Sequence, residues 1–345
     1  MSARPDYWAF WSGDAKRTGS PLYARLAEGI GGDSDLKALA ARARKGQPPA
    51  NMILGAVHFL LLRGADHPLK RFYPTAGGTE YVEGDDPFPL FADFVARHRS
   101  AIERLIESRV TNTNEVGRSA VLHAGFRAVA AEAGAPLNLI EIGPSAGLNM
   151  IWDRFGVRYT RDGEAAAEIA PDAPLVIECE LRGPQIPPLG PAPAIGRRVG
   201  LELNPVNLED GDDRDWLRAL VWPDRPARLA RLDRAIALFR DVAAEVEIRS
   251  GDALDLLLDA VRAMPQREPL CVYHTIALYQ FSAAMKETAE DLLTVAGLRR
   301  PVWRLAFEFD GTDYPLSLVR YHDGTRAERR LALCQPHGAW LEWLG

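Results

Sequence analysis

Cysteine is scarce in this sequence, which has three among 345 residues: Cys179, Cys271 and Cys334. They are far apart and odd in number, so they fit neither a disulfide framework nor a CxxC metal site. The seven histidines include no HExxH or HxH motif, and we therefore predict no metal. Cysteines without a pairing pattern are typical of a reducing compartment, and we expect a cytoplasmic location.

An excess of positive charge and long apolar runs are also lacking. The chain has 41 Lys and Arg against 47 Asp and Glu, a formal net charge of −6, so no basic surface is expected to hold a nucleic acid. The longest apolar run, Ile53–Leu62, is shorter than the roughly 20 residues of a membrane-spanning helix, and the N-terminus has no apolar leader. We expect a protein that is neither exported nor membrane-bound and that has a small-molecule ligand. The oligomeric state is left open.

The sequence does have a globular composition, with 47% hydrophobic and 26% charged residues, which excludes a disordered chain. In the first third, apolar residues recur every three or four positions, as at Leu22, Leu26 and Ile30. This period is that of an amphipathic helix. We predict an all-helical N-terminal domain or lid over about residues 1–130.

Short apolar runs replace this pattern after Pro136. The first predicted strand begins at Leu137 and leads into a tight turn, and further strands are predicted near residues 198–203, 246–249, 270–274 and 302–309. Helical patterns lie between several of them. Strands that alternate with helices indicate a parallel sheet. The predicted fold class is α/β, with a Rossmann-like domain over residues 131–345.

Two segments depart from this alternation. A strand pattern over Leu175–Leu181 precedes five prolines between residues 184 and 193. Because proline cannot donate to a central ladder, we predict a β-rich insertion over about residues 156–197, beside the sheet. Near the C-terminus, strand patterns over Leu316–Tyr321 and Arg329–Cys334 flank Asp323-Gly324, which predicts an antiparallel hairpin.

The stretch Glu141-Ile-Gly143-Pro-Ser145-Ala-Gly147 is the most informative. An acid at the end of a strand, followed by small residues where a helix starts, lets backbone amides approach a ligand. A dinucleotide site would favour the GxGxxG spacing. The spacing here is more similar to the first motif of class I S-adenosylmethionine-dependent methyltransferases. The alternative is a tight turn that needs small residues for packing alone.

Two later acids are candidates for the same site. Glu202 is expected near the carboxyl end of a strand, where a carboxylate accepts hydrogen bonds from ribose hydroxyls. It comes 61 residues after Glu141, so the insertion must fill the gap. Asp252, followed by Ala253, resembles the third-strand motif of these methyltransferases, which implies that it binds the adenine edge. Each acid has a structural alternative: Glu202 would cap a turn at Asn204, and Asp252 would cap the following helix.

A histidine and a group of polar residues are candidates for the acceptor side. His274 is expected at the end of a strand, where it would act as a base or lie satisfied in the interior. Upstream, Asn112 and Glu115 resemble a capping box, but one cap leaves Asn114 and Arg118 unexplained. We assign His274, Glu115 and Arg118 to catalysis, and Asn112 and Asn114 to substrate binding.

The glycine-bearing stretch also contains a literal Gly-x-Ser-x-Gly motif, with Ser145 as the candidate nucleophile of a hydrolase. Asp310 and then His322 or His337 follow in the order that a catalytic triad would need. A hydrolase normally has several strands before its nucleophile, whereas the region before Pro136 has a helical pattern. This difference favours the methyltransferase interpretation.

Several motifs together resemble a bacterial family of unknown activity, domain of unknown function 2332. They are residues 48–62, 111–118, 139–149, 216–223 and 337–343, which span nearly the whole chain. A more distant resemblance, to class I methyltransferases, rests on Glu141–Gly147, Glu202 and Asp252–Ala253. It implies a methyltransferase-type sheet and S-adenosylmethionine as cofactor, although Ser145 replaces the commoner middle glycine.

The residues that this resemblance assigns to the cofactor are Glu141, Gly143, Ser145, Gly147, Asn149, Glu202, Asp252 and Ala253. The expected activity is methyl transfer from S-adenosylmethionine to an unidentified small-molecule or protein acceptor. Two alternatives stay open: a methyltransferase-like binding or scaffolding module without catalysis, and a serine hydrolase that uses Ser145.

Overall fold

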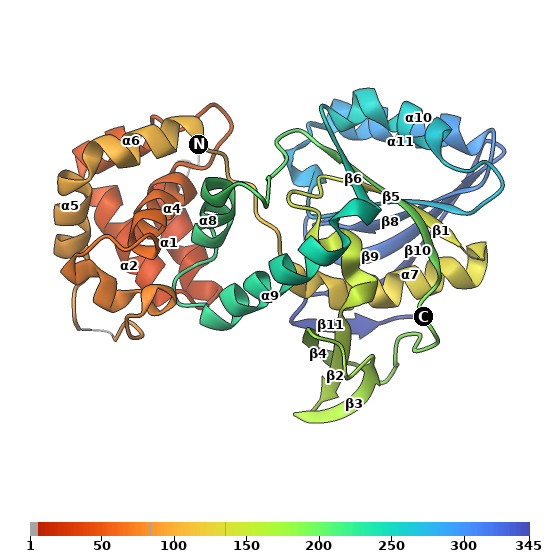
Figure 1. Ribbon diagram of the computed structural model, residues 1–345, viewed down its shortest axis with the longest axis horizontal. Helices are drawn as coiled ribbons and strands as arrows, with labels where there is room; N and C mark the ends of the chain where they lie inside the picture. The colour runs from red at the N-terminus through yellow and green to blue at the C-terminus, as the bar shows by residue number, and fades with distance from the viewer. Residues whose placement is uncertain (1–5, 83, 135) are drawn as a thin grey trace, which may run out of the picture. The chain divides into compact units, whose positions relative to one another are not determined.

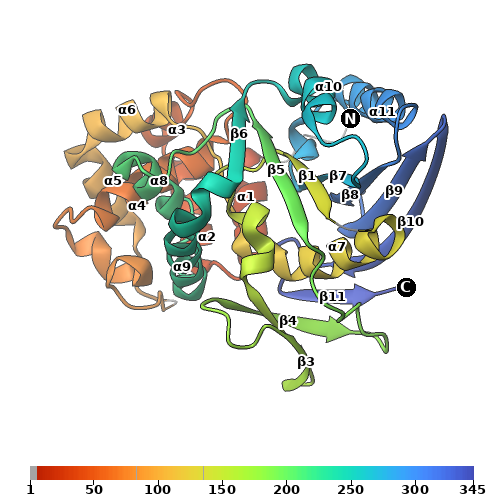
Figure 2. The same cartoon turned by 45° about the vertical axis from the view of Figure 1, so that its right-hand side comes forward.

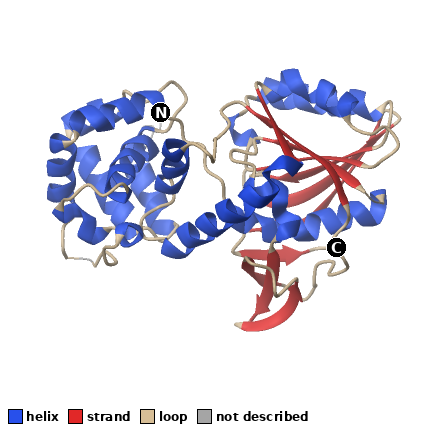
Figure 3. Ribbon diagram, viewed as in Figure 1, coloured by secondary structure: helices blue, strands red, loops and turns tan. Residues whose placement is uncertain are grey.

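A computed structural model of the chain describes residues 6–82, 84–134 and 136–345. The chain forms two compact units. The first consists of Met1–Thr113 and Val206–Asp233, and the second of Asn114–Pro205 and Arg234–Gly345. Helices make up the first unit, and a large sheet with helices makes up the second (Figure 3). The predicted α/β class is confirmed at this level.

The described residues of the first unit form helices and no strand. The helices are α1 (Tyr7–Arg17), α2 (Pro21–Gly32), α3 (Ser34–Ala40), α4 (Pro49–Leu62), α5 (Phe88–Arg97), α6 (Arg99–Ser108) and α8 (Gly211–Ala219), with short 3-10 turns η1 (Pro68–Phe72) and η2 (Pro74–Ala76). Helix α9 (Pro226–Val242) begins in this unit and continues into the second. Helix α4 is apolar around nearly its whole circumference, which is typical of a buried helix.

Packing between α4 and α8 organises the first unit. A Cβ at Gly55 would lie 3.3 Å from Leu220 and 3.4 Å from Trp216, so the small residue lets the two segments approach. Near the end of α4, His58 is fully buried. Its Nδ1 lies 2.9 Å from the Ala219 carbonyl oxygen, and its Nε2 lies 2.7 Å from Thr75 Oγ1. Two of the motifs noted above, residues 48–62 and 216–223, therefore form the core of this unit.

Acidification should destabilise the first unit through His58. Burial lowers the pKa of this histidine to about 4, so between about pH 6.5 and pH 4 the unfolded chain binds a proton that the folded chain does not. Stability should therefore fall with pH across this window, by up to about 3 kcal/mol. In the His58→Gln variant, the stability measured by thermal unfolding should fall less between pH 7 and pH 4.5 than it does in the unsubstituted protein. His322→Gln, which changes an exposed histidine, should leave the loss unchanged. Equal losses in all three proteins would contradict the assignment.

Eleven strands form one sheet in the second unit, in the order β3-β2-β4-β11-β10-β9-β8-β7-β1-β5-β6. They are β1 (Leu137–Ile142), β2 (Gly156–Arg161), β3 (Glu164–Ile169), β4 (Val176–Arg182), β5 (Ile195–Glu202), β6 (Val246–Ser250), β7 (Leu270–Thr275), β8 (Val302–Phe307), β9 (Pro315–His322), β10 (Thr325–Cys334) and β11 (Trp340–Trp343). Most neighbours are parallel; β2 with β3, β8 with β9, β9 with β10, and β10 with β11 are antiparallel.

Helices cover both faces of this sheet (Figure 1). Helix α7 (Ser119–Ala133) packs on one face, and α10 (Ala253–Ala263) and α11 (Ala283–Gly297) pack on the other. Strand residues alternate between the faces: Ile140 and Val272 belong to the apolar core under α10 and α11, whereas Tyr273 meets Phe126 of α7. Short 3-10 turns connect the elements: η3 (Val116–Arg118), η4 (Leu148–Arg154), η5 (Ala243–Glu245) and η6 (Leu278–Gln280).

The insertion differs from its prediction. We expected residues 156–197 beside the sheet, but β2, β3 and β4 are part of it, at the edge opposite β6. The short strand β11 makes this possible, because it pairs with β10 on one side and with β4 on the other. The prolines between residues 184 and 193 lie in the loop that follows β4. The predicted C-terminal hairpin is confirmed, and Asp323 and Gly324 both have positive φ at its turn.

Candidate functional site

The carboxyl ends of five parallel strands meet at one edge of the sheet. Figure 2 shows β6, β5, β1, β7 and β8 next to one another in this order. From β1 the chain continues to β5 and β6 on one side, and then to β7 and β8 on the other. The strand order thus reverses at β1, and the crevice outside such a reversal is where open α/β sheets bind ligands. The edge carries Glu141, Glu202, Asp252 and His274, each at or just beyond a strand end.

The turn after β1 has an unusual backbone. Gly143, Ser145 and Gly147 have φ values of 73°, 57° and 80°, a region that favours glycine. A Cβ at Gly143 would also lie 2.8 Å from the Cβ of Ala277. Glycine is therefore required there for both conformation and space. Ser145 has a side chain in the same region, which indicates local strain held by its surroundings.

Glu202 holds this turn. Its Oε2 accepts a hydrogen bond from the Ser145 amide at 2.8 Å, and its Oε1 accepts one from the Asn204 amide at 2.9 Å. The structural alternative for Glu202, a cap at Asn204, is thus present. Its contact with a ribose stays a prediction.

Glu141 lies beneath the turn and is 1% exposed. Its Oε2 accepts a hydrogen bond from the Tyr273 hydroxyl at 2.8 Å. Burial raises the pKa of this carboxyl to about 8, so near neutral pH Glu141 is largely protonated. The side chain joins β1 to β7 within the packed layer under α7.

Asn114 and Asn149 fix the helical turn that follows. Asn114 Oδ1 accepts from the Leu148 amide at 3.0 Å. Asn149 Nδ2 donates to the Glu115 carbonyl oxygen at 3.3 Å, and its Oδ1 accepts from Ser119 Oγ at 3.0 Å. Asn114 and Asn149, which we predicted to contact a ligand, therefore connect segments of the protein to one another.

Arg118 and Glu115 connect this cluster to two other segments. Arg118 Nη1 donates to the Thr275 carbonyl oxygen at 2.7 Å, and its Nε donates to the Pro336 carbonyl oxygen at 2.9 Å. Glu115 Oε2 lies 3.2 Å from His337 Nδ1. Motifs that are more than 200 residues apart in the sequence thus converge at the end of β7.

The remaining cofactor and substrate candidates have simple placements. Asp252 Oδ1 accepts from the Leu254 amide at 2.9 Å and caps α10, whose first residue is Ala253. The capping alternative is therefore present, and adenine binding stays a prediction. Asn112 belongs to the first unit, and its role also stays a prediction.

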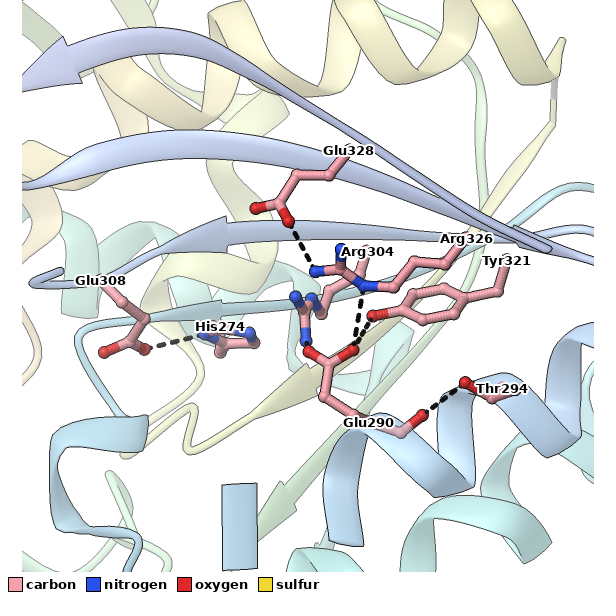
Figure 4. Close-up of polar contacts among 8 residues, drawn as sticks. All are labelled: His274, Glu290, Thr294, Arg304, Glu308, Tyr321, Arg326 and Glu328. Atoms are coloured by element: carbon pink, nitrogen blue, oxygen red, sulfur yellow. Dashed lines mark hydrogen bonds and ion pairs between the residues drawn. The ribbon is translucent and has the colours of Figure 1, made fainter. Parts of the chain in front are cut away.

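His274 forms a dyad with a carboxylate that we did not predict. Its Nδ1 lies 2.8 Å from Glu308 Oε1, which also accepts from the Ala277 amide at 2.8 Å and the Leu278 amide at 3.1 Å (Figure 4). Burial acts to raise the pKa of Glu308, but the bonds from His274 and the two amides outweigh it and lower the pKa. Because an ionised carboxylate only accepts, His274 Nδ1 donates its N–H to Glu308, and in the neutral imidazole Nε2 is then the acceptor nitrogen.

His274 is one of the residues that line a pocket of about 520 Å³. The side chain is 2% exposed, and among the described residues Nε2 has no hydrogen-bond partner. Two residues on, Ile276 has a φ of 52°, a marked outlier for a β-branched residue. A buried base with an oriented ring beside strained backbone is an arrangement found at catalytic sites.

The residues proposed to complete a triad with Ser145 are engaged elsewhere. Asp310 Oδ2 pairs with Arg330 at 2.9 Å. His322 Nδ1 lies 3.4 Å from Asp323, and His337 contacts Glu115. None of these contacts joins Asp310 to either candidate histidine.

One comparison with known proteins identifies a family. Residues 10–343 match the family described as an uncharacterized protein conserved in bacteria, domain of unknown function 2332. The chain belongs to this family. No curated protein and no solved structure matches it. The segments 114–118, 139–149 and 337–343, which converge at this edge of the sheet, lie within the residues that match the family.

Among the residues that the structure describes, every helix is too short or too polar to span a membrane. In the same ranges, His, Cys, Asp and Glu side chains form no group of three or more that could hold a metal ion.

Removing the Glu308 carboxylate should change the tautomer of His274. In the unsubstituted protein, nitrogen chemical shifts of the ring should show Nδ1 protonated, because Glu308 accepts from it. Glu308→Ala should shift the ring towards the Nε2-protonated form, whereas Glu308→Gln, which keeps a carbonyl acceptor, should retain Nδ1–H. Glu287→Ala, a carboxylate that lines the same pocket, is the control. An unchanged tautomer in Glu308→Ala would contradict the dyad.

Glu141 should make the protein less stable at alkaline pH. Its pKa is raised from 4.5 to about 8, so between these values the folded chain retains a proton that the unfolded chain releases. The stabilisation is full below about pH 4.5 and is lost as pH rises through 8. Glu141→Gln, which keeps an acceptor for Tyr273, should match the unsubstituted protein at pH 5. At pH 9 it should be more stable by about 2–4 kcal/mol, measured by denaturant unfolding. Parallel pH profiles for the two proteins would refute this role.

Proposed function

We propose that this protein is an S-adenosylmethionine-dependent methyltransferase. The observation that carries the proposal is the edge at the strand reversal, where the Gly143–Gly147 turn follows β1, Glu202 ends β5 and Asp252 follows β6. The order β6-β5-β1-β7-β8 is the order 3-2-1-4-5 of a doubly wound parallel sheet. Strands β9 and β10, which pair antiparallel, follow β8 in the sheet and leave the order of these five strands unchanged.

The residues at this edge fit an adenosyl ligand. Each Glu202 oxygen accepts one backbone amide, and a carboxylate oxygen has room for a second donor, so a ribose diol remains compatible. Asp252 uses Oδ1 for the helix cap, which leaves Oδ2 for an exocyclic amine. Gly143 presents no side chain where a ligand would approach the turn.

The chemistry needs alignment and at most one base. S-adenosylmethionine, when bound, supplies the methyl group: its carbon–sulfur bond breaks, the electron pair goes to sulfur, and the acceptor's lone pair forms the new bond. His274 Nε2 is positioned to take the acceptor's proton, and Glu308 holds the ring in the required tautomer. The enclosed position of His274 excludes bulk water from the proton transfer.

Calorimetric titration tests the donor site. S-adenosylmethionine and S-adenosylhomocysteine should both bind with micromolar Kd. Asp252→Ser keeps a helix-capping oxygen but removes the carboxylate, and it should weaken binding roughly tenfold through loss of a charge-assisted hydrogen bond. Asp210→Ser, at the cap of α8, is the matched control and should bind normally. No heat at millimolar ligand with a folded protein would refute the proposal and favour a non-catalytic module.

A further inference from the structure

The pocket beside His274 lies on the face of the sheet that α11 covers. Its lining comes from β7, β8, β9, β10, the start of α11 and the loop after β8, all within the second unit. The cavity of about 520 Å³ is within the usual size range of small-molecule sites. Charged side chains of both signs line it, with the acids in excess: Glu287, Glu290, Glu308, Asp310 and Glu328 against Lys286, Arg304 and Arg330. The pocket therefore suits a polar small molecule.

Two buried polar atoms belong to this pocket and have no partner among the described residues. They are Nε2 of His274 and Nε of Arg304, whose residues are 2% and 8% exposed. In the register of β7 and β8, His274 is opposite Ala306, so Arg304 lies two residues back on the same face. Figure 4 shows the His274 ring between Glu308 on one side and the Arg304 guanidinium on the other. An acceptor nitrogen and a cationic donor thus lie on neighbouring strands, on the same face of the sheet.

The cation next to the base is held firmly. Glu290 Oε1 pairs with Arg304 Nη1, and Glu290 Oε2 accepts from the Tyr321 hydroxyl at 2.7 Å. Arg326 lies 3.3 Å from the same oxygen and also pairs with Glu328 at 2.6 Å. These contacts fix the guanidinium while leaving its Nε–H unused.

This arrangement distinguishes between acceptor chemistries. A hydroxyl that gives its proton to His274 Nε2 leaves a negative oxygen, which the Arg304 guanidinium stabilises. An amine that gains a methyl group becomes a cation if it keeps its protons, and Arg304 would repel it. The two side chains therefore favour oxygen as the reacting atom.

We propose that this pocket binds a small molecule through an ionisable hydroxyl group, with His274 as the proton acceptor and Arg304 as the donor to the resulting oxygen anion. Its use as the methyl acceptor rests on the proposed function, whereas binding itself does not. The proton moves from the hydroxyl oxygen to Nε2. His274 then becomes a cation and the ligand oxygen an anion, so the total charge is unchanged.

The probe is 4-nitrophenol, whose anion absorbs visible light, so absorbance reports its ionisation when bound to the full-length protein. Bound phenol should ionise with an apparent pKa at least one unit below that of the free compound. His274→Gln and Arg304→Met should each weaken binding of the anion about tenfold. The controls are His322→Gln and Arg320→Met; Arg320 lies on β9 and contacts Trp303. Thermal unfolding confirms that each variant is folded.

Three results would overturn the proposal: no binding of 4-nitrophenol, binding that neither pocket variant affects, or equal binding of 4-nitroaniline with the same dependence on the variants. Calorimetry with the methyl donor on the same preparations separates this inference from the proposed function. If 4-nitrophenol binds and the methyl donor does not, the assignment of the pocket stands and methyl transfer is refuted. Donor binding without phenol binding refutes the hydroxyl assignment and leaves the methyltransferase proposal standing.

Discussion

The hydrogen bond from the Ser145 amide to the Glu202 carboxylate is the contact on which this edge of the sheet depends. It joins the turn after β1 to the end of β5, although the two residues are 57 positions apart. The turn has three residues with positive φ, a conformation that a chain does not hold without external contacts. Glu202 supplies one such contact, and the close approach of Ala277 to Gly143 supplies another. The shape of the edge is therefore a property of the assembled sheet.

The two faces of the sheet have different roles around β7. Alternation of side chains sends Tyr273 to the α7 face, where it bonds to the buried Glu141, and sends His274 to the α11 face, where it meets Glu308. One pair is enclosed in packed interior and joins two strands. The other borders a cavity and leaves one nitrogen with an unused lone pair. Adjacent residues thus lie in different surroundings, one in packed interior and one beside a cavity.

The polar residues around the end of β7 act mainly through contacts with the backbone. Arg118 donates to two carbonyl oxygens from separate segments, and Asn114 accepts from an amide of the η4 turn. Such contacts satisfy polar groups at loop and strand ends that would otherwise be buried without partners. The same convergence makes the position of His274 depend on segments at both ends of the second unit. A rigid support of this kind is what a preorganised base requires.

The sequence left the roles of Glu202 and Asp252 open between capping and ligand binding, but by itself it determined other local features: the helical first third, the strands of the parallel sheet and the C-terminal hairpin. These follow from periodicity and from side chains that bond within a few residues, both of which are written in neighbouring positions. Only the tertiary structure decided that β2, β3 and β4 join the sheet through β11, that Glu141 is enclosed, and that Glu308 orients His274. Each of these depends on which strands become neighbours and in which register. That choice is made by burial of the whole apolar surface, and no single segment of the sequence encodes it.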